Sequence, residues 1–395
     1  MSERVFLPAM SVATCLGLGK AANAEGLFAG RRDGLVAQAG FTVPVGAIAT
    51  ALPALPAGLA GWDCRNNRLL SALAGEIGGD IADAVARYGR DRVAVVIGTS
   101  TSGIAEGEAA ATHFLGQGTW PAGYHYRQQE TGSGAAFLAR LLGVTGPAYV
   151  IATACSSSAK AFAAARRLIR CGLADAAVVG GADTLCRLTV AGFSALEAVS
   201  PRHCNPFSAN RDGITIGEGG ALFVMTREPA EIALLGVGES SDAHHVSAPD
   251  PDGAGALAAM GLAVADAGLK PADIAYVNLH GTATRLNDAM ESKAVHNLVG
   301  GGVPCSSTKA MTGHTLGAAG AVEAAFLWLT LSGRWNPDGR VPPQVWDGIR
   351  DPDLAPLALA DGNTRLPAGE RVAALSNSFA FGGSNCGLVF GRGWR

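Results

Sequence analysis

Residues 153–160 read Thr-Ala-Cys-Ser-Ser-Ser-Ala-Lys and place a cysteine where an apolar strand meets a long helix. Residues 148–151 before them are short, apolar and preceded by Gly-Pro, which is typical of a buried strand. Residues 159–169 are rich in alanine, carry arginines toward their end and stop before Gly172, which predicts a helix. Cys155 is therefore expected near a helix N-terminus, where unpaired N–H groups and the helix dipole favour the thiolate and lower the thiol pKa below about 8.5.

A lone cysteine also has a simpler explanation. Free cysteine is among the most often buried residue types, and the serines after Cys155 could merely cap the helix. The rest of the chain has to decide whether Cys155 reacts or packs.

The composition is that of a compact, layered protein. The 395 residues include 54 glycines, 48% are hydrophobic and only 16% are charged, and this length allows two domains or one large double domain. A net charge of −3 gives no basic footprint for nucleic acid. The eight cysteines show no CxxC pair, so reduced thiols in a cytoplasmic protein are expected rather than disulfides or a metal site.

The first residues leave a choice between a signal peptide and a folded start. Arg4 precedes a largely apolar run to Leu18, and Ala-Asn-Ala at 22–24 imitates a cleavage site. Pro8 and Lys20 interrupt the run, so a folded start is the expectation. No other run is long and apolar enough to predict a membrane span.

Buried strands alternate with helices along the chain, which predicts an α/β layered architecture. A second round of strands and helices begins near residue 234, so the chain divides into halves at 1–234 and 235–395. Helical spacing is found at 69–87 and 317–331, and the predicted strands are 92–97, 148–151, 175–183, 221–225, 274–279, 372–378 and 388–390.

Two histidines lie at strand ends or turns. His280 begins His-Gly-Thr-Ala-Thr after the strand 274–279, and His314 ends Lys-Ala-Met-Thr-Gly-His at 309–314. A histidine beside glycine and threonine at such a position can donate to a developing oxyanion, although either ring alone could be an ordinary satisfied polar group.

Four motifs in order carry a family resemblance. They are Thr-Ala-Cys-Ser-Ser at 153–157, His-Gly-Thr-Ala-Thr at 280–284 with Asn287-Asp288, the stretch 309–314, and Asn-Ser-Phe-Ala-Phe-Gly-Gly-Ser-Asn at 377–385. Over nearly the whole chain this arrangement resembles the elongating β-ketoacyl-acyl-carrier-protein synthases, and the run 279–288 also resembles members of aryl-polyene pathways. The resemblance implies a thiolase-like fold of five αβαβα layers, with the nucleophile in the first half, both histidines in the second, and usually a homodimer.

The resemblance also implies the chemistry. Cys155 would accept an acyl group, with its oxyanion held by the N–H groups of Cys155 and Phe381, and His280 and His314 would drive decarboxylation of a malonyl unit. The implied reaction is a decarboxylative Claisen condensation that extends a fatty-acid or polyene chain by two carbons. Its substrates would be carried on the phosphopantetheine arm of an acyl-carrier protein, with no metal or redox cofactor.

Three further pairs have roles by resemblance and simpler alternatives. Lys309 and Glu323 resemble a pair that would orient His314 and tune its protonation, or they form a purely structural ion pair. Thr282 and Thr284 would hold the phosphopantetheine arm, or they stabilise a turn. Phe379 and Phe381 of the glycine-rich loop would gate the acyl pocket, or they belong to the hydrophobic core.

Other functions stay open at this point. A thiolase-type enzyme acting on acyl-CoA would need Cys386 as a second essential cysteine. A non-catalytic chain-length partner would typically lack Cys155, but this chain could be the active member of a heterodimer with such a partner. An initiating synthase would have asparagine in place of His314.

Overall fold

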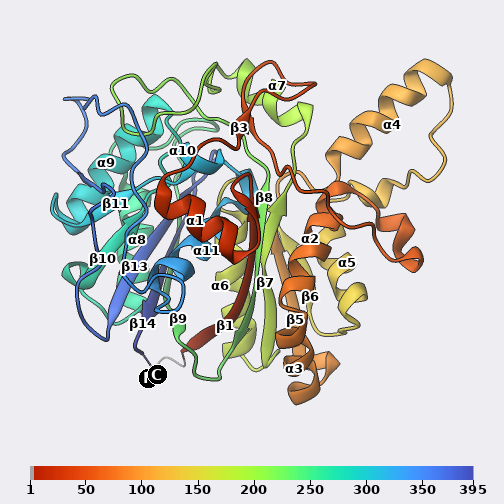
Figure 1. The fold of residues 1–395 in the computed structure, drawn as a ribbon, viewed down its shortest axis with the longest axis horizontal. Helices are drawn as coiled ribbons and strands as arrows, with labels where there is room; N and C mark the ends of the chain where they lie inside the picture. The colour runs from red at the N-terminus through yellow and green to blue at the C-terminus, as the bar shows by residue number, and fades with distance from the viewer. Residues whose placement is uncertain (1–3, 395) are drawn as a thin grey trace.

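A large mixed sheet forms the frame of the protein in the computed structural model, which describes residues 4–394 (Figure 1). Two halves meet where Val5 pairs with Leu234 and Phe6 with Ala233, giving one sheet of 12 strands. The first half contains, in spatial order, β1 (Val5–Thr14), β8 (Gly219–Thr226), β7 (Ala176–Asp183), β5 (Val93–Gly98) and β6 (Ala148–Ile151), with β2 (Gly17–Leu18) beside β1. The second half contains β9 (Ile232–Ser241), β14 (Ser384–Arg392), β13 (Val372–Phe379), β10 (Ile274–Asn278), β11 (Pro304–Ser306) and β12 (Ala358–Leu359).

Both halves repeat one strand pattern. β5 lies between its parallel neighbours β6 and β7, and β10 lies between its parallel neighbours β11 and β13. An antiparallel strand follows in each half, β8 next to β7 and β14 next to β13. Parallel strands covered on both faces consist of continuous apolar runs, which is why every residue of β5 and β7 is buried.

Helices complete five layers. α6 (Ser157–Arg170) and α11 (Ala319–Leu331) pack against each other between the two half-sheets, and all 13 residues of α11 are buried. A helix that is apolar on every side requires this covered position. The outer face of the first half carries α2 (Arg65–Glu76), α3 (Gly78–Tyr88) and α5 (Ser133–Leu142), and that of the second carries α8 (Ala254–Asp266) and α9 (Arg285–Val299).

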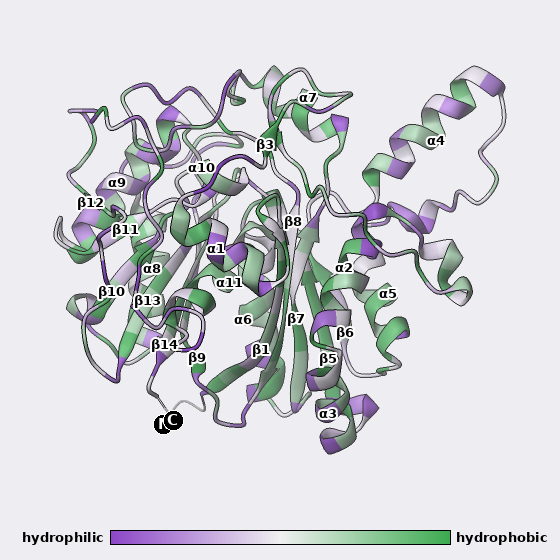
Figure 2. Ribbon diagram, viewed as in Figure 1, coloured by the Kyte–Doolittle hydropathy of each residue, from purple (hydrophilic) through white to green (hydrophobic). Residues whose placement is uncertain are grey.

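The remaining elements are short or peripheral. Figure 2 shows apolar residues concentrated in the strands and central helices, whereas polar residues gather on peripheral helices and loops. The short or peripheral elements are α1 (Lys20–Ala29), α4 (Ile104–Gln117), α7 (Arg187–Ala195), α10 (Lys309–Thr312), β3 (Leu35–Val36), β4 (Val45–Gly46) and the 3₁₀ helices η1 (Ala57–Trp62), η2 (Arg90–Arg92), η3 (Tyr126–Gln128), η4 (Pro271–Asp273) and η5 (Leu316–Ala318).

Some predicted boundaries were wrong. The helical spacing at 69–87 belongs to two helices, because Ile77 leaves helical geometry at φ −116° and ψ 22° and two glycines, weak helix formers, follow it. The division into halves at 1–234 and 235–395 stays a prediction, and β9 crosses it. The helix after Cys155 begins at Ser157, two residues earlier than predicted.

One edge of the sheet is open. β6 is the last strand of the first half, and its first two residues are exposed, including Tyr149 at 38%. α4 extends away from the body of the protein beyond this half of the sheet (Figure 1). Within residues 4–394, the helices are too short or too polar to cross a membrane.

Candidate active site

The nucleophile candidate lies on the turn between β6 and α6. Ala154 has a φ of +51°, a left-handed conformation that is costly for a residue with a side chain and gives the chain a sharp turn. Ser157 fixes this turn, since its hydroxyl accepts from Thr153 N at 2.9 Å and donates to Ala154 O at 2.5 Å. Cys155 is thereby held two residues before the first residue of α6, as the sequence predicts.

A strand end and a turn after a short helix bring the two histidines to the same place. His280 follows β10, and Glu291 of α9 holds its backbone by accepting from the N–H groups of His280 and Gly281 at 2.7 Å each. His314 follows Gly313, whose φ of +71° turns the chain after α10, and its N–H donates to Thr215 O at 2.7 Å.

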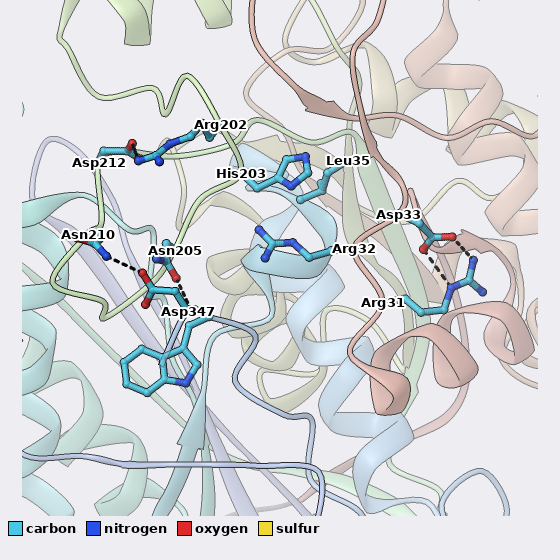
Figure 3. A pocket seen from close by; sticks show the side chains of 11 residues that line it. Arg31, Arg32, Asp33, Leu35, Arg202, His203, Asn205, Asn210, Asp212 and Asp347 are labelled. Atoms are coloured by element: carbon cyan, nitrogen blue, oxygen red, sulfur yellow. Dashed lines mark hydrogen bonds and ion pairs between the residues drawn. The ribbon is translucent and has the colours of Figure 1, made fainter. Parts of the chain in front are cut away.

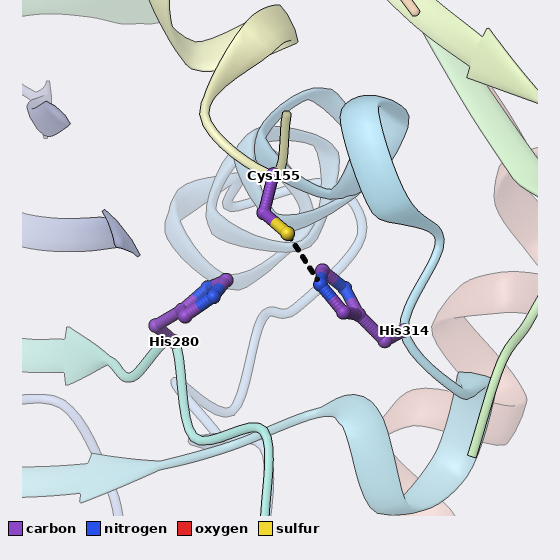
Figure 4. A group of neighbouring side chains, drawn as sticks. All are labelled: Cys155, His280 and His314. Atoms are coloured by element: carbon purple, nitrogen blue, oxygen red, sulfur yellow. Dashed lines mark hydrogen bonds between the residues drawn. The ribbon is translucent and has the colours of Figure 1, made fainter. Parts of the chain in front are cut away.

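Cys155, His280 and His314 form one buried cluster (Figure 4). His314 Nε2 lies 3.0 Å from Cys155 Sγ, and the three potential ligand atoms lie within 4.8 Å of one another. The two imidazole rings are nearly perpendicular, at 85°, with centroids 5.3 Å apart. The residues are only 5%, 1% and 2% exposed, in the order named, so the cluster is nearly free of water.

The predicted lowering of the Cys155 pKa was wrong. Burial is the largest effect and raises the pKa of the thiol to about 11, while the Lys309 charge and the N–H groups of Phe381 and Cys155 act in the opposite direction. Desolvation disfavours the charged form of a buried thiol, and here it outweighs the helix N-terminus. The resting cluster therefore contains a thiol, and the N–H groups of Phe381 and Cys155, which the sequence predicts as the oxyanion hole, each lower its pKa as hydrogen-bond donors.

Lys309, expected to orient and tune His314 together with Glu323 or to form an ion pair with it, pairs with Glu323 and lowers the pKa of His314 by its charge, but its direct histidine contact is with His280. Its ammonium lies 3.3 Å from His280 Nδ1, donates to His280 O at 2.5 Å and pairs with Glu323. Because an ammonium can only donate, Nδ1 of His280 must accept, and the ring proton is left on Nε2. Burial raises the pKa of Glu323 to about 7, against the lowering effect of Lys309.

Both imidazoles are neutral at ordinary pH. Burial lowers the pKa of His280 and of His314 well below the usual value, and the charge of Lys309 lowers both further. Neutral imidazoles can accept a thiol proton or donate one hydrogen bond without being strong acids.

Residues expected at the substrate channel separate into two groups. Phe379 is buried and its ring packs against His280 at 6.1 Å. Phe381 and Thr284 line a cavity of about 280 Å³ that opens to the surface, and Phe381 also packs against Phe193 at 5.6 Å. Thr282 is buried beneath this opening, with its hydroxyl 3.1 Å from that of Thr284.

A larger cleft of about 1040 Å³ lies beside this opening and contains none of the predicted site residues (Figure 3). The two share Asp212, which pairs with the exposed Arg202 at 3.1 Å. The cleft is lined by Arg31, Arg32, Asp33, Leu35, Arg202, His203, Asn205, Asn210, Asp212, Trp346 and Asp347.

Cys386, the second cysteine that a thiolase would need, lies in the hydrophobic core. It belongs to β14, is fully buried, and burial raises the pKa of its thiol to about 12. The cluster of potential ligand atoms around Cys155 does not include it.

The cluster also has to be weighed as a metal site, since one thiol and two imidazoles are ligands that zinc accepts. The ammonium of Lys309 contacts one of these imidazoles and its positive charge acts on the other. A fixed positive charge at this distance opposes a cation, so the donor set favours acid–base chemistry over metal binding.

Sequence reasoning missed three residues that shape the cluster: Asp183, Glu291 and Phe193. Of the three, Asp183 would have been the easiest to predict from the sequence. It ends a continuous apolar strand, and the carboxyl ends of such strands are where the sites of α/β proteins gather. Phe193 carried no signal, since its contact with Phe381 joins distant segments.

Comparisons with known proteins agree with this geometry. The chain matches the N-terminal domain of β-ketoacyl synthase at residues 81–230 and the C-terminal domain at residues 231–340. The 3-oxoacyl-[acyl-carrier-protein] synthase 2 of Staphylococcus aureus (strain COL) is 37% identical over 270 residues, which cover 63% of this chain and 62% of that protein. The protein of that name from Synechocystis sp. is 34% identical over 320 residues, covering 76% of this chain and 75% of the relative. The chain thus spans about 62% of the length of the first of these relatives.

Solved structures extend the similarity along the chain. A chain of the ketosynthase ApeO in complex with its chain length factor ApeC, from Xenorhabdus doucetiae, is 45% identical with a TM-score of 0.92, covering 99% of this chain and 98% of that one. The ishigamide ketosynthase/chain length factor is 27% identical with a TM-score of 0.88, covering 99% of this chain and 100% of that one. The protein belongs to the β-ketoacyl synthase family, and the predictions of this family and of a thiolase-like fold are confirmed.

Proposed function

We propose that this protein is an elongating β-ketoacyl-acyl-carrier-protein synthase. The observation that carries the proposal is the buried cluster of one thiol and two neutral imidazoles, with two backbone N–H groups facing the sulfur. This set contains a nucleophile, a proton acceptor and donors for two developing oxyanions.

In the first half-reaction the Cys155 sulfur attacks the carbonyl carbon of an acyl thioester on a carrier protein. His314 Nε2, 3.0 Å away, accepts the thiol proton, and the N–H groups of Cys155 and Phe381 hold the oxyanion. The C–S bond to the carrier then breaks, and the pantetheine thiolate takes the proton and leaves. The result is an acyl group on Cys155 and a free carrier thiol.

The second half-reaction begins with a malonyl thioester. Its carboxylate carbon leaves as carbon dioxide, and the electron pair of that bond becomes an enolate whose oxygen accepts from His280 Nε2–H and from His314, which in this half-reaction carries its single ring proton on Nε2. The enolate carbon attacks the acyl-Cys155 carbonyl and the C–S bond to Cys155 breaks. The sulfur leaves as a thiolate and takes one proton from solvent to restore the resting thiol, and the product is a β-ketoacyl thioester two carbons longer. No step of this reaction oxidises or reduces a group, so we propose no resident metal or redox cofactor.

The cavity of about 280 Å³ fits the entry of a phosphopantetheine arm. Its lining includes Thr284, with Thr282 behind it, and the hydroxyls of both can hydrogen-bond the amides of such an arm. Phe381 lies between this cavity and Cys155, and Gly382 and Gly383 follow it with φ of +84° and +78°. Glycine hinges of this kind let the aromatic ring move as a gate.

We propose two protein partners, an acyl-carrier protein at this opening and a second synthase-like subunit at the open sheet edge. β6 leads directly into the nucleophile turn, where Ala152 and Ala154 are exposed beside the buried Cys155. A subunit that covers β6 would close this side of the site. The ApeO complex contains a chain length factor, so the second subunit is either another copy of this chain or a partner of that kind, and native mass spectrometry distinguishes them.

A thiolase-type reaction is the weaker candidate, because Cys386 is a core residue. We place the enzyme in the cytoplasm, in keeping with free cysteines, since oxidising compartments favour disulfides.

Intact-mass measurement tests the proposal. The protein and a Cys155→Ala variant are incubated with carrier proteins that bear different acyl groups. One acyl adduct that is absent in the variant supports the proposal, and the preferred group identifies the pathway. If the folded protein forms no adduct alone or with a chain-length partner, the proposal is wrong.

A further inference from the structure

A buried carboxylate lies behind the catalytic cluster and has no role in the reaction described above. Asp183 ends β7, is 1% exposed, and accepts hydrogen bonds from five donors on two other segments. A carboxylate with such a set of donors can hold segments together, because each lost contact would leave a buried polar group unpaired.

The first segment is the loop after β5. Asp183 Oδ1 accepts from Thr99 Oγ1 at 2.5 Å, from Ser100 N and Thr101 N at 2.8 Å each, and from Thr101 Oγ1 at 2.9 Å, and Oδ2 also accepts from Ser100 N at 3.0 Å. Both threonine hydroxyls already accept a backbone N–H, from Ser102 and Thr184, so their own protons are free to point at Asp183. Because every contact is a donor, the ionised carboxylate fits this environment.

The second segment is η5, which begins two residues after His314. Asp183 Oδ2 accepts from Ala318 N at 3.1 Å. Gly317 packs so closely on the loop that an added Cβ would lie 2.7 Å from Ser100 N. The same loop touches the nucleophile turn, since Ser100 Oγ donates to Ala154 O at 3.4 Å. Asp183 therefore connects the segment of His314 with the turn of Cys155.

We propose that Asp183 is a positioning residue that fixes His314 relative to Cys155 by joining η5 to the loop at residues 99–101. The proposal rests on the proposed function and adds an acid to the site that touches no substrate. A displacement of about 1 Å between reacting groups can cost about 100-fold in rate, which gives such a junction its importance.

The charge of Asp183 provides a second, independent readout. The groups that act on the Cys155 thiol are the ammonium of Lys309, which lowers its pKa, the anion of Asp183, which raises it, and the neutral rings of His280 and His314. Removing the anion must therefore lower the thiol pKa, whereas loosening the junction alone must leave it unchanged.

Three variants separate these effects. Asp183→Asn keeps an oxygen for the loop donors to Oδ1 but turns an amide N–H₂ toward the N–H groups of Ala318 and Ser100, so the contact with η5, one of the two contacts with Ser100 N and the charge are lost. Gly317→Ala pushes η5 away from Ser100 and keeps the charge. Thr101→Val removes one loop donor and the acceptor of Thr184 N–H, and it keeps both the charge and the Ala318 contact. Each folded variant is checked by its melting temperature.

Two rates are measured on each protein: iodoacetamide alkylation of Cys155 against pH, and decarboxylation of malonyl-carrier protein. We expect Asp183→Asn to shift the alkylation profile to lower pH by about half a unit or more, which is a rate about threefold higher at a given pH, and to slow decarboxylation about tenfold at unchanged KM. Gly317→Ala should slow decarboxylation with an unchanged alkylation profile, and Thr101→Val should change either rate at a given pH by less than about threefold.

Wild-type decarboxylation in either Asp183→Asn or Gly317→Ala overturns the proposal, as does equal loss in all three variants, which would indicate general packing damage. Should Asp183→Asn not fold, Gly317→Ala decides alone. Alkylation of Cys155 requires no thioester substrate, so it can be measured even if the proposed function is wrong. A wild-type protein whose Cys155 is alkylated normally but which never decarboxylates malonyl thioesters contradicts the proposed function. In that case the shift of the Asp183→Asn alkylation profile still tests the effect of the Asp183 charge.

Discussion

The ionisation of Cys155 gives the sharpest test of how the site works. Burial raises the thiol pKa from an ordinary 9.0 to about 11. Below about pH 9 this lowers the fraction of ionised Cys155 about 100-fold. At about pH 7.5, only about one Cys155 in 3000 would be ionised. The rate of iodoacetamide alkylation should therefore rise about tenfold per pH unit through the whole range from about 6 to 10, without a plateau.

Lys309→Met gives this prediction a direction. The ammonium of Lys309 lowers the thiol pKa, so its removal should move the alkylation profile of Cys155 to higher pH. Peptide mass spectrometry after timed quenching measures the rate constant for each cysteine separately. Cys171 is free and exposed on the same protein, and its profile should be identical in both proteins. A plateau of wild-type alkylation near neutral pH would refute this reasoning, because it would show a preformed thiolate–imidazolium pair.

Three further predictions concern other parts of the site. His280→Ala should slow carbon dioxide release from malonyl-carrier protein by about 100-fold or more while the Cys155 adduct still forms. His314→Ala should slow both carbon dioxide release and adduct formation, because His314 also accepts the thiol proton, and release at the wild-type rate in either variant would contradict the assigned donors. Arg202→Glu and Arg285→Glu, near the opening of the cavity, should raise the KM for acyl-carrier protein about tenfold but leave acyl transfer from a small thioester unchanged, so equal effects on both substrates would exclude a docking role. Cys386→Ser should lower the melting temperature yet retain condensation in the folded fraction, and an inactive but stable variant would favour the thiolase reading.

Local sequence pattern was sufficient for the elements that carry the site. Apolar runs and the glycines next to them predict the strand before Cys155, the helix after it, the strand end before His280 and the turn at Gly313 before His314. The order of the four motifs along the chain then identified the family, because four motifs seldom occur in the same order in unrelated proteins. The prediction that Ile77 lies inside one helix failed because the break depends on two following glycines within an otherwise helical pattern.

Electrostatics were less predictable from the sequence. The helix N-terminus argued for an ionised Cys155, but the opposing desolvation depends on how completely distant segments cover the sulfur. Lys309 lies five residues from His314 in the chain, yet its ammonium contacts His280, which follows the neighbouring strand β10. Such effects depend on three-dimensional neighbours, which neither spacing nor composition reveals.

The electrostatic design of the cluster suits the second half of the proposed reaction better than the first. An enolate is rapidly protonated by water or by a strong acid, so a site that forms one benefits from burial and from weak donors. Burial and Lys309 keep His280 and His314 neutral, and a neutral imidazole N–H stabilises an enolate oxygen without surrendering its proton as readily as imidazolium. The same burial keeps Cys155 protonated, which penalises its attack on the acyl thioester. His314, 3.0 Å from the sulfur, offsets that penalty by accepting the proton only as the new bond forms.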